Sequence, residues 1–120
     1  MLDAVYEALQ GMRPPFLPYE ADIHALVGET LTRQGLSARH EAPLCRGCRI
    51  DYLVGDVGVE IKKGKPSPAA LLPQLRRYAA CEGVSALIVV TQRSVRLPQS
   101  VGGKPLRQLV LNQLWGVSLP

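Results

Sequence analysis

The sequence predicts an α/β domain in which helices flank a mixed central sheet. A segment with apolar residues at helical spacing precedes three short β-rich segments, which are separated by turns that contain glycine. A second helical segment then leads to a continuous apolar run that is typical of a strand covered on both faces. The length of 120 residues and the hydrophobic content of 47% fit one domain, spanning residues 1–120, with its own core.

The first part of the chain predicts two helices. Residues 2–10 place apolar side chains at steps of three and four and predict a short amphipathic helix. A connector rich in proline follows, up to residue 18. Residues 19–34 predict a longer helix, which Gly35 ends at its C-terminus. We expect the core to span residues 19–91.

Three strands are expected next, as a meander. They occupy residues 36–45, 48–54 and 57–62. The dipeptides Arg46-Gly47 and Gly55-Asp56 separate them, and glycine with aspartate between β-rich runs is a frequent tight hairpin turn. We therefore expect consecutive strands of this region to be antiparallel neighbours.

A further helix follows the meander. Ser67 and Pro68 fit the cap and the first position of a helix that extends to about Cys81. Pro73 lies within this window, so the helix either kinks there or begins nearer to Leu72.

The C-terminal part predicts two more strands. The run VSALIVVT at residues 84–91 is the buried strand named above. Within the C-terminal segment, residues 92–120, we expect another strand at 106–111 and a tail in which Trp115 packs against the core.

Charge is distributed unevenly along the chain. Residues 1–60 contain five Lys or Arg and nine Asp or Glu, whereas residues 61–120 contain nine Lys or Arg and one acid. A basic half favours a polyanionic partner such as nucleic acid, because lysine and arginine release counterions from phosphates. A solvated basic surface is the alternative.

The apolar segments are too short for a membrane protein. No apolar run approaches the roughly 20 residues that span a bilayer. The first residues, MLDAVYEALQ, lack the basic start of a secretory signal. We therefore expect a cytoplasmic protein without a membrane partner.

Three ionisable residues occur inside the expected strands, where apolar residues would be usual. If the Gly-Asp turn has two residues, counting outward from it pairs Asp51 with Glu60, on one face of the sheet. Lys62 shares the face of Glu60 because side chains alternate along a strand. Two adjacent carboxylates repel each other unless a proton or a cation lies between them.

A hard divalent cation suits this pair. Mg²⁺ or Mn²⁺ would bind the carboxylates of Asp51 and Glu60 and, as a further ligand, the carbonyl group of Ile61. Lys62 would orient a metal-bound water or take its proton. The alternative is an ion pair between Glu60 and Lys62, with Asp51 facing solvent.

The motif formed by Asp51, eight intervening residues and Glu60-Ile61-Lys62 resembles the signature of the PD-(D/E)XK nucleases, with Ile50 in place of the proline of that family. The resemblance implies a restriction-endonuclease-like core with the order αβββαβ. It also implies that Asp51 and Glu60 bind Mg²⁺ or Mn²⁺, and that Lys62 assists the water that attacks a DNA phosphodiester.

Members of this superfamily often add an acid from the first core helix. Glu20 begins the frame ExxIxxxVxxxL, which such helices resemble, and this implies a role as a metal ligand. At 100° per residue, Glu20 lies about 40° from the apolar stripe of the helix and Asp22 about 120° from it. Glu29 lies further away, and the choice among the three acids stays open.

The segment QLRRY fits the next expected helix. Gln74 and Tyr78 are one helical turn apart and share a face. They resemble the QxxxY motif of RecB-type and lambda-exonuclease-type members, which implies that both belong to the catalytic site. Tyr78 as an ordinary core residue is the alternative. The candidate contacts to DNA phosphates are Lys63, Lys65, Arg76, Arg77, Arg93 and Arg96.

We therefore expect a metal-dependent nuclease that hydrolyses double-stranded, single-stranded or branched DNA. A non-catalytic nucleic-acid-binding or assembly subunit of the same fold is the alternative. The similarity to small Holliday-junction resolvases implies a homodimer, and a separate partner subunit is a further option.

The cysteines permit several interpretations. Their odd number, at Cys45, Cys48 and Cys81, argues against a disulfide framework. With His24 or His40 they would complete a four-ligand zinc site. Otherwise Cys45 and Cys48 are small cross-strand residues, and the histidines are an ordinary helix residue and an ordinary strand residue.

Overall fold

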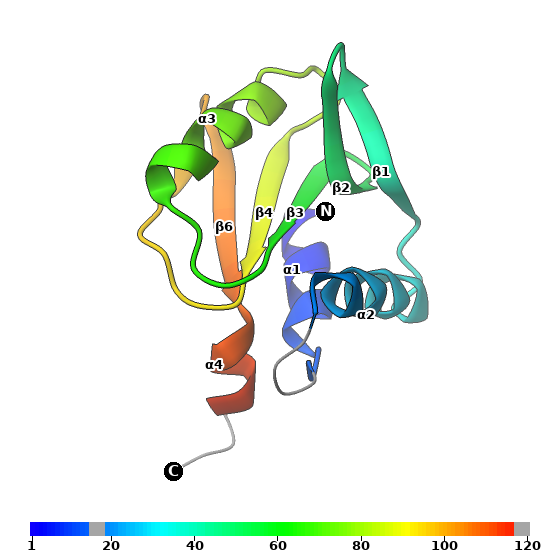
Figure 1. Cartoon of the computed structure of the whole chain (residues 1–120). Helices are drawn as coiled ribbons and strands as arrows, with labels where there is room; N and C mark the ends of the chain where they lie inside the picture. The colour runs from blue at the N-terminus through cyan, green and yellow to red at the C-terminus, as the bar shows by residue number, and fades with distance from the viewer. Residues whose placement is uncertain (15–18, 117–120) are drawn as a thin grey trace.

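The computed structural model describes residues 1–14 and 19–116, with side chains as far as residue 114. The side chain of Trp115, which we expect to pack against the core, is therefore outside the described part of the structure. The same holds for residues 117–120. Up to residue 91, helices and strands follow in the expected order (Figure 1). Their bounds are α1 (Leu2–Gln10), α2 (Glu20–Arg33), β1 (Ala38–Cys45), β2 (Cys48–Val54), β3 (Val57–Lys62), α3 (Pro68–Ala79), β4 (Ala86–Thr91), β5 (Ser100–Val101), β6 (Lys104–Val110) and α4 (Leu111–Gly116).

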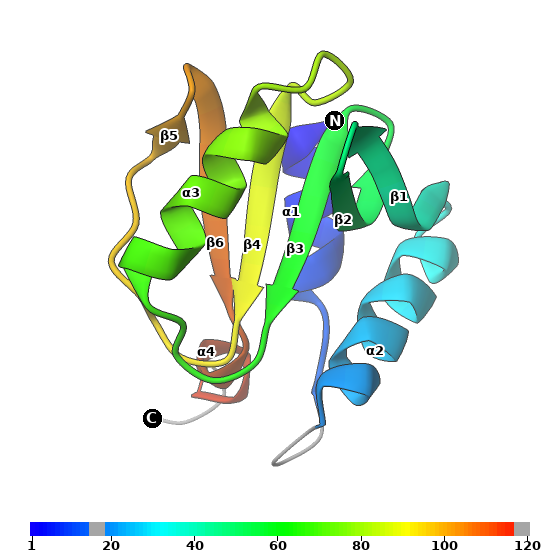
Figure 2. The same cartoon turned by 45° about the horizontal axis from the view of Figure 1, so that its top comes forward.

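The strands form one mixed sheet with the order β1-β2-β3-β4-β6-β5 (Figure 2). Strands β1, β2 and β3 are antiparallel neighbours, as the two turns predict. Strand β4 returns parallel to β3 after the α3 crossover, and β6 lies parallel to β4. The prediction of an α/β fold with a mixed sheet between helices is confirmed.

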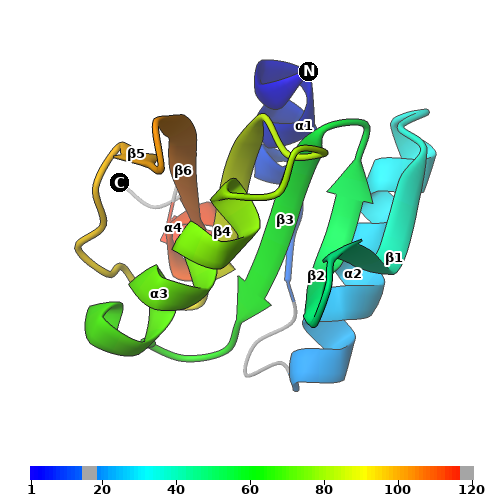
Figure 3. The same cartoon turned by 90° about the horizontal axis from the view of Figure 1, so that it is seen from above.

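The sheet is covered on both faces. Helices α1 and α2 lie on one side and α3 on the other (Figure 3). One core cluster joins Val5, Ile23 and Val27 of the first two helices to the sheet, and the other joins Leu71 and Leu75 of α3 to the opposite face. All six residues of β4 are buried, which explains its run of five apolar residues before Thr91.

Helix α2 ends as the glycine predicts. The amide of Gly35 donates to the carbonyl of Thr32 at 3.0 Å, and the amide of Leu36 donates to that of Leu31 at 2.9 Å. Gly35 has a φ of +75°, which an L side chain would strain. Because this cap uses Gly35 and Leu36, β1 begins at Ala38, two residues later than expected.

Helix α3 begins at Pro68 and passes through Pro73 to Ala79. It therefore ends two residues earlier than expected and does not start near Leu72. Proline at this position leaves the carbonyl of Ala69, one turn earlier, without its helical donor. Pro73 and Ala69 are both exposed, so water can hydrogen-bond to that carbonyl.

The C-terminal part differs more from the prediction. Strand β6 spans Lys104–Val110, two residues earlier at its start than expected, and pairs with the short β5 that was not predicted. Helix α4 follows β6 directly, where we expected a tail. In the described part of the chain, no helix has the length and apolar character needed to cross a membrane.

Candidate functional site

Strands β2 and β3 pair in the register that the two-residue turn predicts. Val54 lies opposite Val57, and the pairing continues outward to Tyr52 opposite Val59. The regular pairing ends there, so the two strands separate at Asp51. The carboxylate motif thus lies where the sheet opens.

The side chain of Asp51 bridges the two strands at this point. Its Oδ2 atom accepts a hydrogen bond from the amide of Ile61 at 2.7 Å. In return, the amide of Asp51 donates to Oε1 of Glu60 at 3.3 Å. Each carboxylate thus accepts a hydrogen bond from the backbone of the other strand, although Asp51 and Glu60 are not paired in the ladder.

Glu60 is held from two elements. Only 4% of this residue is exposed, and its Oε2 atom lies 3.4 Å from Nζ of Lys62. From α3, the hydroxyl group of Tyr78 lies 3.2 Å from the same oxygen and 3.0 Å from the carbonyl of Arg49, so its single proton can be donated to either acceptor. Gln74 donates to the Tyr78 hydroxyl at 2.9 Å.

The surroundings of Glu60 favour its neutral form. Burial raises the pKa of Glu60 to about 7, and the negative charge of Asp51 adds to this, while Lys62 partly opposes it. Burial, followed by the charge of Glu60, also raises the pKa of Tyr78, so this hydroxyl stays protonated at neutral pH. A cation between the carboxylates would relieve the cost of ionising Glu60.

Helix α2 contributes a residue that the sequence prediction treated as ordinary. Nε2 of His24 lies 3.9 Å from Oδ2 of Asp51, and its Nδ1 lies 3.4 Å from Nε2 of His40. The hydroxyl of Tyr52 donates to the carbonyl of His24 at 2.7 Å and fixes this turn of the helix. Helical spacing could have identified His24 from the sequence, because it lies one turn after the candidate ligand Glu20 and about 40° from it around the helix.

The three candidate acids of α2 are all exposed. Asp22 accepts a hydrogen bond from the amide of Tyr19 at 2.9 Å and thus caps the helix. Among the described residues, no hydrogen bond or ion pair joins Glu20, Asp22 or Glu29 to Asp51. Glu20 begins the helix, four residues before the histidine that reaches the site.

The loops that follow β3 and β4 lie side by side. The amide of Gly64 donates to Oε1 of Gln92 at 3.0 Å, and the amide of Arg93 donates to the carbonyl of Gly64 at 3.1 Å. Lys62 lies opposite Thr91 at this edge of the sheet. The side chains predicted to contact phosphates are exposed, and they are Lys63, Lys65, Arg76, Arg77, Arg93 and Arg96.

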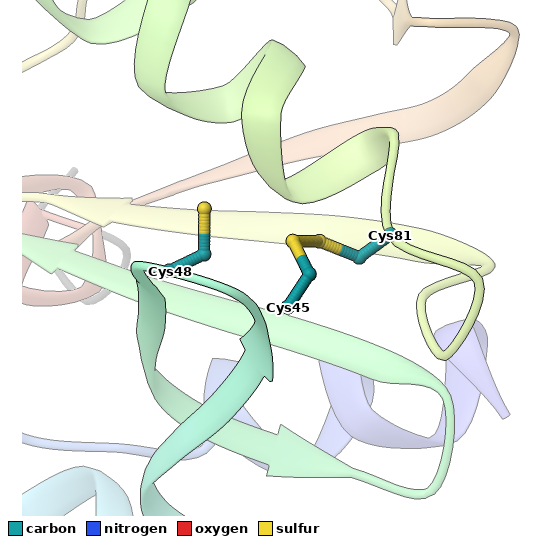
Figure 4. Close-up of side chains that lie close together, drawn as sticks. All are labelled: Cys45, Cys48 and Cys81. Atoms are coloured by element: carbon teal, nitrogen blue, oxygen red, sulfur yellow. A yellow bond between two sulfur atoms is a disulfide. The ribbon is translucent and has the colours of Figure 1, made fainter.

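The cysteines correct one expectation. Cys45 and Cys81 form a disulfide with a Cα–Cα distance of 6.0 Å. The expectation that three cysteines, an odd number, would form no disulfide framework is therefore wrong for this pair. The pairing could not be read from the sequence because the residues are 36 positions apart and meet only when α3 packs on the sheet. Cys48 is free and lies opposite Cys45 (Figure 4). His24 lies near Asp51 instead, and His40 contacts the other ring nitrogen of His24.

Comparisons of the chain with models of protein families, with curated proteins and with solved structures found no match.

Proposed function

We propose that the protein is a Mg²⁺- or Mn²⁺-dependent nuclease of the PD-(D/E)XK type, with a restriction-endonuclease-like core, that hydrolyses DNA phosphodiesters. The observation that carries this proposal is the position of Asp51 and buried Glu60 beside Lys62, where β2 and β3 separate.

The donor set fits a hard cation. Asp51 and Glu60 offer carboxylate oxygens from facing strands, and their mutual repulsion, which adds to the effect of burial on the pKa of Glu60, would be offset by a bound cation. The carbonyl of Ile61 is a further candidate ligand. When bound, the ion lowers the pKa of a coordinated water and offsets charge on the phosphate.

Helix α2 is the third source of ligands. Glu20 stays a candidate, and His24 joins it because its Nε2 atom lies 3.9 Å from Asp51. An imidazole nitrogen suits Mn²⁺ better than Mg²⁺. Helix α2 would thus close the side of the site opposite α3.

Lys62 would act on the attacking water. Its ammonium group lies 3.4 Å from Oε2 of Glu60, and it is about one-third exposed, so it can reach both the carboxylate and a water. It would orient the water and, when deprotonated, accept its proton.

Gln74 and Tyr78 would position Glu60. Tyr78 keeps its proton because its pKa is raised, and it can therefore donate to the ionised carboxylate. Gln74 in turn orients the hydroxyl group by donating to its oxygen. The exposed lysine and arginine side chains of the adjoining loops would contact DNA phosphates, and a homodimer or a partner subunit would enlarge this surface.

Cleavage assays test the proposal. Plasmid, single-stranded and branched DNA are incubated with the protein in Mg²⁺, Mn²⁺ or EDTA. Cleavage should need the metal and fall at least about hundredfold in Asp51→Asn, Glu60→Gln and Lys62→Ala, since each removes a group that acts in the chemical step. Arg33→Ala, at the far end of α2, is the control and should cleave as the unmodified protein does. Cleavage in EDTA, or an unchanged rate in Lys62→Ala, would contradict the proposal.

A second candidate is a nucleic-acid-binding or assembly subunit without turnover. The exposed basic residues on the loops after β3 and β4 favour this candidate as well. Binding of DNA without cleavage in either metal would favour it over the nuclease.

A further inference from the structure

We propose that the reduced protein binds one Zn²⁺ ion through the thiolates of Cys45, Cys48 and Cys81. Their sulfur atoms all lie within 4.8 Å of one another, although they belong to three different segments (Figure 4). This site is separate from the carboxylates of Asp51 and Glu60 and does not depend on the proposed nuclease activity.

The β1–β2 hairpin supplies two of the ligands. Cys45 ends β1 and Cys48 begins β2, and the two residues lie opposite each other across the turn. Gly47, with a φ of +77°, allows this tight turn. Two cysteines separated by two residues are a frequent half-site for structural zinc, because the turn directs both sulfur atoms to one side.

The segment that follows helix α3 supplies the third ligand. Cys81 lies two residues after the end of the helix and is buried, and its sulfur atom is bonded to Cys45 of the hairpin. In a tetrahedral site with Zn–S bonds of about 2.3 Å, the sulfur atoms are about 3.8 Å apart. The observed cluster needs only small side-chain movements to reach this spacing once the disulfide is open.

Access and charge also suit the ion. Cys45 is exposed and Cys48 half-buried, so an ion can enter from solvent. Zn²⁺ with three thiolates carries a net charge of −1, and Nζ of Lys104 offsets it, lying 3.1 Å from the carbonyl of Cys81. No histidine or carboxylate joins the group among the residues that the structure describes, so water would complete the coordination.

The disulfide and the zinc site exclude each other. A phosphine reductant opens the Cys45–Cys81 bond: phosphine, water and the disulfide give phosphine oxide and two thiols. Zn²⁺ then displaces the protons of the three thiols as it binds. Both the disulfide and the ion would connect the end of α3 to the β1–β2 hairpin, so reduction would exchange one link for another.

Cobalt titration tests the site. Protein reduced with a phosphine is titrated with Co²⁺, whose bonds to thiolate give an intense charge-transfer band in the near ultraviolet. We expect the band to saturate at one Co²⁺ per chain, and one equivalent of Zn²⁺ to abolish it. The oxidised protein should not give the band, because two of the three sulfur atoms are then in the disulfide.

Two variants make the result specific. Cys48→Ser keeps the Cys45–Cys81 pair, so its fold can be checked in the oxidised state, and after reduction it should lose most of the band. His40→Ala removes an imidazole that contacts His24 and lies outside the cysteine group, and it should titrate like the unmodified protein. An absent band in the reduced protein, equal binding by Cys48→Ser, or loss of binding in His40→Ala would overturn the proposal.

Discussion

Glu60 is the residue whose environment most strongly opposes its usual charge state. Burial and the neighbouring Asp51 raise its pKa from 4.5 to about 7. Between these two values the folded chain keeps a proton that the unfolded chain releases. Protonation of Glu60 therefore stabilises the folded chain fully below pH 4.5, and this stabilisation is lost as the pH rises through about 7.

Replacing this carboxyl group should remove that dependence. Between pH 5 and pH 8 without divalent metal, we expect the free energy of unfolding of the unmodified protein to fall relative to Glu60→Gln, by up to about 3 kcal/mol. Chemical denaturation at both pH values measures the difference. Glu29→Gln, an exposed acid of α2, is the control and should follow the unmodified protein. If Glu60→Gln and the unmodified protein had the same pH dependence, the pKa of Glu60 would not be raised in the folded chain.

The residues of the site were predictable to different degrees. The proximity of Asp51 and Glu60 follows from strand alternation and turn length, which are local properties. The position of His24 beside Asp51 depends on how α2 packs across the sheet, and no local pattern contains that information. The metal-binding roles of Asp51 and Glu60 stay predictions, as do the roles of Glu20, Lys62, Gln74 and Tyr78.

At the scale of elements, a close approach between α2 and β2 places His24. The hydroxyl of Tyr52 reaches the carbonyl of His24, and a Cβ atom on Gly28 would lie only 2.6 Å from that hydroxyl. The ring of Tyr52 is buried and stacks on His40 with a centroid distance of 4.5 Å, so it has little room to move aside. Glycine at this helical position therefore permits the hydrogen bond.

Gly28→Ala should destabilise the protein. Alanine favours a helix by about 1 kcal/mol over glycine, but the clash and the lost hydrogen bond oppose this, and we expect a net loss of about 1–2 kcal/mol. Urea denaturation measures the change. Gly83→Ala, in the turn after α3, is the control without a clash, because a Cβ atom on Gly83 would meet nothing within 4 Å. It should change stability by less than about 0.5 kcal/mol. Equal or greater stability of Gly28→Ala would contradict this account of α2 docking.

Elements with a strong periodic pattern were predicted well, and those defined by tertiary contacts were not. Helix α1 matches its expected bounds, and the β2–β3 turn sets the register as expected. The two-residue strand β5 is too short to have a period and exists only through pairing with β6. Pro73 continues α3 because its surroundings are exposed, which the sequence pattern does not reveal.

At the scale of the whole molecule, several basic residues of the C-terminal half lie together at one edge of the sheet. Strands β3 and β4 are parallel, so the loops that follow them leave the same edge of the sheet. Hydrogen bonds through Gly64 join these loops and place exposed Lys63 and Lys65 near Arg93. Lys62, at the end of β3, belongs to the same edge. The proposed site and its basic surroundings would thus face one substrate.

This arrangement predicts a defined loss of DNA affinity. The double variant Lys63→Ala with Lys65→Ala removes two proposed phosphate contacts. It should weaken DNA binding and reduce the slope of log affinity against log salt by about 2, since each contact contributes about 0.9. Fluorescence anisotropy at several salt concentrations, with EDTA present to prevent cleavage, measures both quantities. Arg33→Ala removes a positive charge about 13 Å along the helix axis from His24 and should leave the slope unchanged. An unchanged slope in the double variant would show that this edge is a solvated basic surface and would place any DNA contact elsewhere.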